Sequence, residues 1–323
     1  MNRRWLALGA ATLVVGGAAL AKAETAMVDH GLPMYQRMGG IAGNLNSIGS
    51  DTLNNLMTFW AEGFAKYYPN VKIQVEGKGS STAPPALIAG TAQLGPMSRP
   101  MKSSELDAFE KKYGYKPTAV AVALDALAIY VNKDNPIQNL SLEQVDAIFS
   151  GTRACGGKSS ISTWSQLGLG SEWNRPISLY GRNSASGTYG YFKDNALCKG
   201  DYKSSVKEQP GSATVVEGLS NDRYAIGYSS MGYRTAGVRV VPLSPLGSSK
   251  VYAATPEDVY ASTYPLSRYL YIYVNRAPGQ PLDTLVKQFL VYVLSQEGQE
   301  VVVKDGFIPL LKEIEDVELK KLE

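Results

Sequence analysis

The sequence predicts an α/β protein of two domains that are joined by two long strands. Strand-spaced and helix-spaced apolar residues alternate along the chain, which is typical of α/β folds with mostly parallel sheets. The length of 323 residues suits one large or two medium-sized domains. Two long apolar segments, 119–132 and 266–275, both end in Ile-Tyr-Val-Asn. They could be two edge strands, but we expect a hinge at which the chain crosses to a second domain and later returns.

The elements expected in the first domain follow one another closely. Leu53, Leu56, Trp60 and Phe64 recur at helical spacing after a short strand at 44–49. A second strand at 71–75 is followed by a helix that carries two prolines in its first turn, where proline is tolerated. A strand at 94–97 and a helix at 103–113 complete this region.

The rest of the chain predicts the second domain and a return to the first. The run Ser141–Gln144 resembles a helix capping box, and 177–180 reads as a strand. A helix at 282–294 is expected to pack back on the first domain, and the charged end, 312–323, is expected to be solvated. We therefore predict a first domain of residues 24–126 and 264–323 and a second domain of residues 127–263.

The N-terminus has the features of an export signal. Arg3 and Arg4 precede an apolar run that extends to Leu20, and a small-x-small pattern ends at Ala23. We expect residues 1–23 to be a cleaved signal peptide and the protein to be periplasmic or secreted. The alternative, an uncleaved membrane anchor, is disfavoured by the short, Gly- and Ala-rich run.

The only two cysteines, Cys155 and Cys198, lie beyond this leader. In an exported protein such a pair can form one disulfide, although two buried free thiols remain the alternative. No cysteine follows the apolar run directly, so a lipoprotein anchor is not expected.

Charge and composition exclude several function classes. The formal net charge is +3, charged residues make up 19% of the chain, and no basic block is present, which argues against a nucleic-acid binder. The single histidine, His30, lies near the leader and argues against a histidine-based triad or metal site. We expect no cofactor and a monomer.

Three segments place hydroxyl residues and glycine where a helix is expected to begin. Helix N-termini expose free N–H donors and a partial positive charge, short hydroxyl side chains add donors, and glycine allows a close backbone approach. Three such ends together could form a cage for an anion, and Arg182 could add a charge-assisted contact. The segments are Gly49–Leu53 with Ser50, Asp51, Thr52 and Leu53; Gly79–Thr82 with Ser80 and Ser81; and Arg182–Thr188 with Ser186, Gly187 and Thr188.

Each segment alone could be an ordinary helix N-cap, because Ser, Thr and Asp are preferred there. Three together, one with an arginine, favour a binding site for a small oxyanion. Ser98 and Arg99, after the strand at 94–97, are further candidates; Arg99 could reach the ligand or form a salt bridge at the surface.

These motifs resemble those of the periplasmic phosphate-binding proteins of bacterial phosphate ABC transporters. The resemblance covers roughly residues 44–311, and its most specific part is Arg182 followed by Ser186-Gly187-Thr188. The other matching motifs are Gly49–Thr52, Gly79–Thr82, Met97–Pro100, Ala225–Tyr228 and Pro265–Arg268.

The resemblance implies a Venus-flytrap fold that closes on inorganic phosphate and delivers it to a membrane permease. It implies contacts from Thr52, Leu53 and Ser80 in one domain. From the other domain it implies contacts from Arg182 and from Ser186, Gly187 and Thr188.

One position departs from the family pattern. Several members carry, where this chain has Ser98, an aspartate that accepts the proton of a protonated phosphate and repels sulfate. Asp51 could take that role, or could be a helix cap or a partner for Arg99. Binding of another oxyanion such as sulfate therefore stays open.

Two further classes of function also stay open. A secreted phosphatase-type enzyme is disfavoured because the expected metal, histidine or Gly-x-Ser-x-Gly motifs are missing. A secreted adhesion or matrix protein on the same fold is the other alternative.

Overall fold

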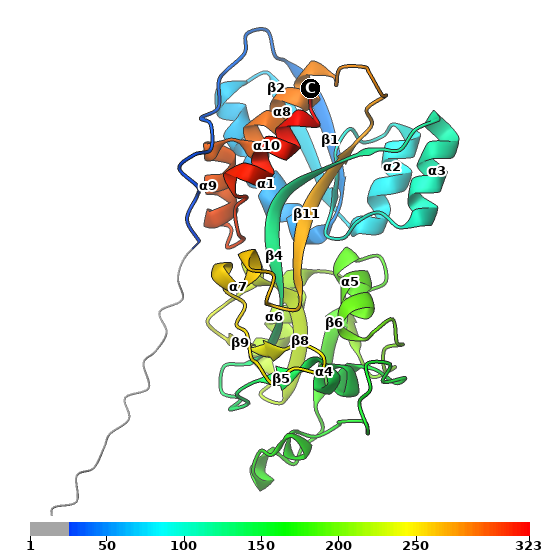
Figure 1. The fold of residues 1–323 in the computed structure, drawn as a ribbon, viewed down its shortest axis with the longest axis vertical. Helices are drawn as coiled ribbons and strands as arrows, with labels where there is room; N and C mark the ends of the chain where they lie inside the picture. Colours follow the sequence, from blue (N-terminus) through cyan, green and yellow to red (C-terminus); the bar gives the residue numbers. More distant parts are fainter. Residues whose placement is uncertain (1–25) are drawn as a thin grey trace, which may run out of the picture.

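The computed structural model describes residues 26–323, so the predicted signal peptide lies outside the described residues. Two lobes follow one another along the long axis of the molecule, and β4 and β11 run from one lobe toward the other (Figure 1). Within residues 26–323, no helix combines the length and apolar character needed to cross a membrane.

The strands alternate with helices over most of the chain. The strands are β1 (Gly43–Gly49), β2 (Val71–Gly77), β3 (Gly95–Met97), β4 (Thr118–Asn132), β5 (Leu140–Ser141), β6 (Ser178–Arg182), β7 (Lys207–Gln209), β8 (Ala225–Ser230), β9 (Val238–Val241), β10 (Leu243–Ser244) and β11 (Ser267–Val274). The α-helices are α1 (Asn54–Tyr67), α2 (Ala83–Ala89), α3 (Ser103–Tyr113), α4 (Leu142–Phe149), α5 (Gly187–Ala196), α6 (Ser212–Asn221), α7 (Pro256–Tyr260), α8 (Thr284–Leu294), α9 (Gln296–Lys304) and α10 (Lys312–Lys320). Short 3-10 turns are η1 (Asp51–Leu53), η2 (Ser80–Thr82), η3 (Trp164–Leu167), η4 (Ser171–Trp173) and η5 (Met231–Tyr233).

Strand β4 belongs to the sheets of both lobes. The main sheet has the order β3-β11-β4-β8-β6-β7, with β9 also paired to β4. Residues of β4 up to Ala126 pair with β11, whereas the pairing with β8 begins at Leu127. In the first lobe, β1 pairs in parallel with β2 and reaches β3 through a single bridge between Ser47 and Leu94. The predicted two-domain α/β fold with hinge-crossing strands is therefore confirmed, while the exact domain bounds stay a prediction.

Most of the expected elements are present. The two prolines of the second expected helix occupy the first turn of α2, and α3 spans the expected residues. Ser141 caps α4 by accepting a hydrogen bond from the N–H of Gln144, whose side chain accepts one from the N–H of Ser141 in return. This reciprocal pair is the capping box that the sequence indicates.

The charged C-terminus differs from the expectation of a solvated end. Residues 312–320 form α10, in which Glu315 is fully buried and Glu318 nearly so. Glu318 accepts a hydrogen bond from the N–H of Ala121 in β4 and pairs with Lys321, so one face of this helix packs on the sheet. The high charge of the segment conceals an amphipathic helix whose inward acids have partners.

Candidate functional site

Three helical turns begin just past the carboxyl ends of strands β1, β2 and β6, at the boundary between the lobes (Figure 1). β1 runs parallel to β2, and β6 runs parallel to β8, so these strand ends lie at the edges where α/β proteins hold their ligands. The turns are η1, η2 and α5, the same three segments that the sequence indicates.

Residues of the two lobes meet at this boundary. Thr52 Oγ1 lies 3.0 Å from Thr188 Oγ1 across it. A Cβ atom at Gly187 would lie 2.2 Å from Ser80 Oγ and 2.7 Å from Ser98 Oγ, so no side chain fits there. The structure thus brings the three predicted segments and Ser98 together in one place.

The hydroxyl groups of the first lobe form a buried network. Ser50 Oγ donates to Ser98 Oγ at 3.1 Å, and Ser98 Oγ lies 3.3 Å from Ser80 Oγ. The N–H groups of Ser98 and Thr52 donate to Ser80 Oγ and Ser50 Oγ respectively. Ser50, Thr52, Ser80 and Ser98 are all at most 2% exposed. Ser50 Oγ already donates its proton to Ser98 Oγ, and Ser80 and Ser98 share one contact, so one O–H of that pair remains available for donation.

The helix at the site in the second lobe is capped by a predicted site residue. Ser186 Oγ accepts hydrogen bonds from the N–H groups of Thr188 and Tyr189. The first-turn N–H of Gly187, like that of Leu53 in η1, lies where a helix provides no internal acceptor. These helix starts carry a partial positive charge toward the boundary.

Arg182 is the buried cation of the second lobe. Its side chain is 1% exposed, and burial lowers its pKa while Asp51 opposes that shift. Nη1 donates to Ser212 Oγ at 2.7 Å, and Nη2 donates to the carbonyl oxygen of Pro210 at 3.0 Å. Nε is buried and has no partner among the described residues. An unpartnered guanidinium N–H at this boundary is a donor available to an anion.

Two further charged residues lie beside these groups, and the sequence did not indicate a role for them, although Arg268 ends one of the matching motifs. Asp125 in β4 is fully buried and is the cross-strand partner of Arg268 in β11. Arg268 Nε and Nη2 donate to Asp125 Oδ2 at 2.9 and 2.8 Å. Arg268 also donates to the carbonyl oxygen of Ser98 and to Thr188 Oγ1. The signal that could have revealed them was a lone aspartate in an apolar strand, since a buried charge needs a partner.

Three predicted residues have protein partners; for Arg99 this is the salt bridge that the sequence left open, although Arg99 is buried and not at the surface. Arg99 forms a bidentate salt bridge with Glu105, with both N–O distances 2.7 Å, so its charge is neutralised away from the hydroxyl network. Ser81 donates from both N and Oγ to the carbonyl oxygen of Ala185, which ties η2 to the second lobe. Asp51 is a partner of Arg182 and not of Arg99. We therefore leave Arg99 and Ser81 out of the set that we propose to contact a ligand.

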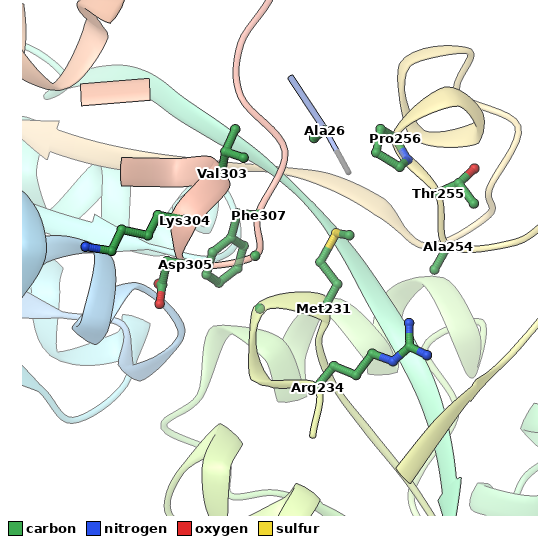
Figure 2. Close-up of a pocket in the computed structure, with 12 residues that line it drawn as sticks. Ala26, Met231, Arg234, Ala254, Thr255, Pro256, Val303, Lys304, Asp305 and Phe307 are labelled. Atoms are coloured by element: carbon green, nitrogen blue, oxygen red, sulfur yellow. The ribbon is translucent and has the colours of Figure 1, made fainter. Parts of the chain in front are cut away.

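A separate cavity of about 490 Å³ opens between the lobes next to η5, and no predicted site residue lines it (Figure 2). Arg234 and Met231 line it from the second lobe, and Lys304 and Asp305 from the first. Burial raises the pKa of Asp305 to about 7, and its Oδ2 has no partner among the described residues.

Comparisons with known proteins agree with this arrangement. A sequence profile described as a PBP superfamily domain matches residues 38–297. The phosphate-binding protein PstS of Pseudomonas aeruginosa is 56% identical over 316 residues, which cover 98% of each chain. The chain belongs to the PstS family of this superfamily.

Two solved structures of other proteins share the fold. A putative phosphate ABC transporter substrate-binding protein with bound phosphate, from Clostridium perfringens, superposes with a TM-score of 0.70 at 26% identity. That match covers 83% of this chain and all of the other. An ABC-type phosphate transport receptor from Vibrio cholerae matches in fold with a TM-score of 0.64 at 23% identity, over 82% of this chain and all of that one.

The two cysteines of this PstS-family chain are also joined. Cys155 and Cys198 form a disulfide that ties the loop after α4 to the end of α5. The bond therefore braces the helix whose first turn forms part of the site. It confirms the predicted pairing and excludes two free thiols.

Proposed function

We propose that the protein captures inorganic phosphate between its two domains and delivers it to the permease of an ABC transporter. The buried Nε–H of Arg182, which has no partner among the described residues, carries the proposal. The 56% identity to a phosphate-binding protein over nearly the whole chain supports it. The role is binding, not catalysis.

The charges around the site favour an anion bound mainly by neutral donors. Arg182 is paired with Asp51, and Arg268 with Asp125, so these four residues cancel in charge. Hydroxyl protons, helix-start N–H groups and the free Nε–H remain to meet a tetrahedral oxyanion. We propose that the direct contacts come from Ser50, Thr52, Leu53, Ser80, Ser98, Arg182, Ser186, Gly187 and Thr188.

We propose that Asp125, and not Asp51, distinguishes phosphate from sulfate. Both carboxylates already have protein partners. Asp51 Oδ2 lies 3.2 Å from Arg182 Nη1 and accepts from the N–H of Ser212. Asp125 accepts from Arg268 and Ser230. The choice of Asp125 rests on its link through Arg268 to the hydroxyl of Thr188. The guanidinium group of Arg268 bridges Asp125 and Thr188, because its Nη2 donates to both Asp125 Oδ2 and Thr188 Oγ1. A carboxylate there can accept the proton of hydrogen phosphate, and it repels sulfate, which has no proton to donate.

Calorimetric titration with phosphate, sulfate and arsenate tests the proposal. Arg182→Lys removes the Nε donor and the planar fork, and should weaken phosphate binding by roughly 100-fold or more. Arg223→Lys is the matched control, because Arg223 is exposed and stacks on Trp173 with its guanidinium carbon 4.8 Å from the ring centroid. Asp125→Asn should raise the affinity for sulfate relative to phosphate. A wild-type protein that binds none of the three anions would contradict the proposed function.

We further propose that the protein acts outside the cytoplasm as a monomer. The disulfide suits an oxidising compartment such as the periplasm. Light scattering coupled to size-exclusion chromatography measures the oligomeric state, and fractionation of expressing cells locates the mature chain.

A further inference from the structure

We propose that Asp51 is a positioning residue that clasps the second domain when the cleft closes and makes no contact with the anion. The inference rests on the proposed phosphate site. It assigns to Asp51 a role in the lifetime of the closed complex, separate from the choice of anion.

The carboxylate of Asp51 reaches two groups of the opposite lobe. Its Oδ2 lies 3.2 Å from Arg182 Nη1 and accepts a hydrogen bond from the N–H of Ser212 at 2.8 Å. Ser212 is the first residue of α6, so the negative charge also lies at the positive end of a ten-residue helix. Gly211 leaves room for this approach, since a Cβ there would lie 3.2 Å from Asp51 Oδ1.

The backbone of the same turn is held as well. The hydroxyl of Tyr233 in η5 donates to the carbonyl oxygen of Asp51 at 2.9 Å and to that of Thr52 at 3.3 Å. The second lobe therefore grips η1 from two sides, through α6 and through η5. Both contacts join separate lobes, so both are lost when the lobes part.

The clasp also determines which donor of Arg182 is left for a ligand. Ser212 Oγ and Asp51 share Nη1, and the carbonyl oxygen of Pro210 takes Nη2. Only Nε remains without a partner among the described residues. Asp51 thus fixes the orientation in which the guanidinium group presents that N–H.

A contact made only in the closed state slows opening and leaves the first encounter unchanged. Loss of one partner from a buried charge pair acts mainly on the dissociation rate. The Asp51 contacts slow dissociation equally for every anion that permits closure, because the carboxylate touches protein groups alone. Asp51 therefore should affect phosphate and sulfate equally.

Stopped-flow binding of phosphate and sulfate to the full mature chain with Asp51→Asn provides the test. We expect the dissociation rate to rise roughly 10- to 100-fold, since the amide keeps the shape and loses the charge. The association rate should change by less than about threefold, because affinity changes lie mostly in dissociation. The phosphate-to-sulfate affinity ratio should be unchanged.

Two controls support the interpretation. Asp201→Asn removes an exposed carboxylate that pairs with Lys193 at 2.8 Å, and it should leave both rates as in the wild type. Asp51→Ser also removes the carboxylate but introduces a different side chain. If the Asn variant folds poorly, the Ser variant should show the same rise in dissociation rate and the same unchanged phosphate-to-sulfate ratio. Small-angle scattering at saturating phosphate should show a more open average shape for either Asp51 variant than for the wild type.

Three results would overturn the clasp. These are a changed phosphate-to-sulfate ratio, an effect confined to the association rate, and rates equal to those of the wild type. Failure of the proposed function is distinguishable, because the wild-type protein would then bind no phosphate in the same instrument.

Discussion

Replacing Arg268 with methionine should destabilise the protein strongly through the aspartate that it leaves behind. Asp125 is fully buried, and the Arg268 side chain is 3% exposed, so neither charge can turn to solvent. After the substitution, Asp125 keeps only the hydrogen bonds from Ser230 Oγ and the N–H of Met231. Leaving one member of a buried ion pair without its partner costs about 3–5 kcal/mol.

That cost is a large part of the total stability, which is about 5–15 kcal/mol for a typical protein. Urea unfolding followed by tryptophan fluorescence measures it. The double variant Asp125→Asn with Arg268→Met should recover most of the lost unfolding free energy, because no buried charge then remains. The two single substitutions should therefore be coupled by at least about 1 kcal/mol.

The double-mutant cycle can also refute the coupling of Asp125 and Arg268. If the two free-energy changes add to within about 0.5 kcal/mol, the pair is not a coupled unit. If Arg268→Met alone costs less than about 1 kcal/mol, the burial argument is wrong, since that is the range of exposed ion pairs. Lys133→Met, which removes an exposed cation whose partner Asp134 is exposed as well, serves as the control for loss of a lysine or arginine charge.

Two further predictions concern stability. Replacing both cysteines with serine should cost up to about 4 kcal/mol of unfolding free energy, because the bond closes a loop between residues 43 positions apart; urea unfolding with and without reductant measures it. Asp305→Asn should stabilise the protein above pH 7. Burial raises the pKa of Asp305 to about 7 from 3.8, so the folded state holds a proton that the unfolded state has released, and stability falls as pH rises from about 4 to 7. The variant should lack this fall, and its unfolding free energy at pH 8 should exceed that of the wild type by roughly 1–2 kcal/mol after allowance for partial exposure. Melting temperatures at pH 5 and pH 8 measure the effect. An equal difference between variant and wild type at both pH values would contradict the prediction.

The sequence contained the site segments because their chemistry is local. Ser186, Gly187 and Thr188 combine a cap, a close approach and a hydroxyl within one turn, and a helix start can be recognised from such neighbours alone. The capping box at Ser141 and the two prolines of α2 were predictable for the same reason. Each of these depends on residues within a few positions of one another.

The pairing of charges was not predictable, because it depends on residues brought together by the fold. Asp51 is separated from Arg182 by more than a hundred residues, and the sequence offered Arg99 as an equally reasonable partner. Glu105 takes Arg99 instead, from the first turn of α3. Asp125 was overlooked within its apolar run because its partner, Arg268, lies 143 residues further along the chain.

The change of partners along β4 also has a mechanical consequence. Ala126 is paired to the return strand and Leu127 to β8, so a continuous ladder of hydrogen bonds runs through the boundary. A twisted ladder resists shear and permits a change of twist. When the two lobes rotate relative to each other, we expect β4 and its paired strands to twist. Asp125 and Arg268 lie next to the axis of that twist, where atoms move least. A fluorescent reporter of closure should be attached far from that axis, where the same rotation produces the longest path.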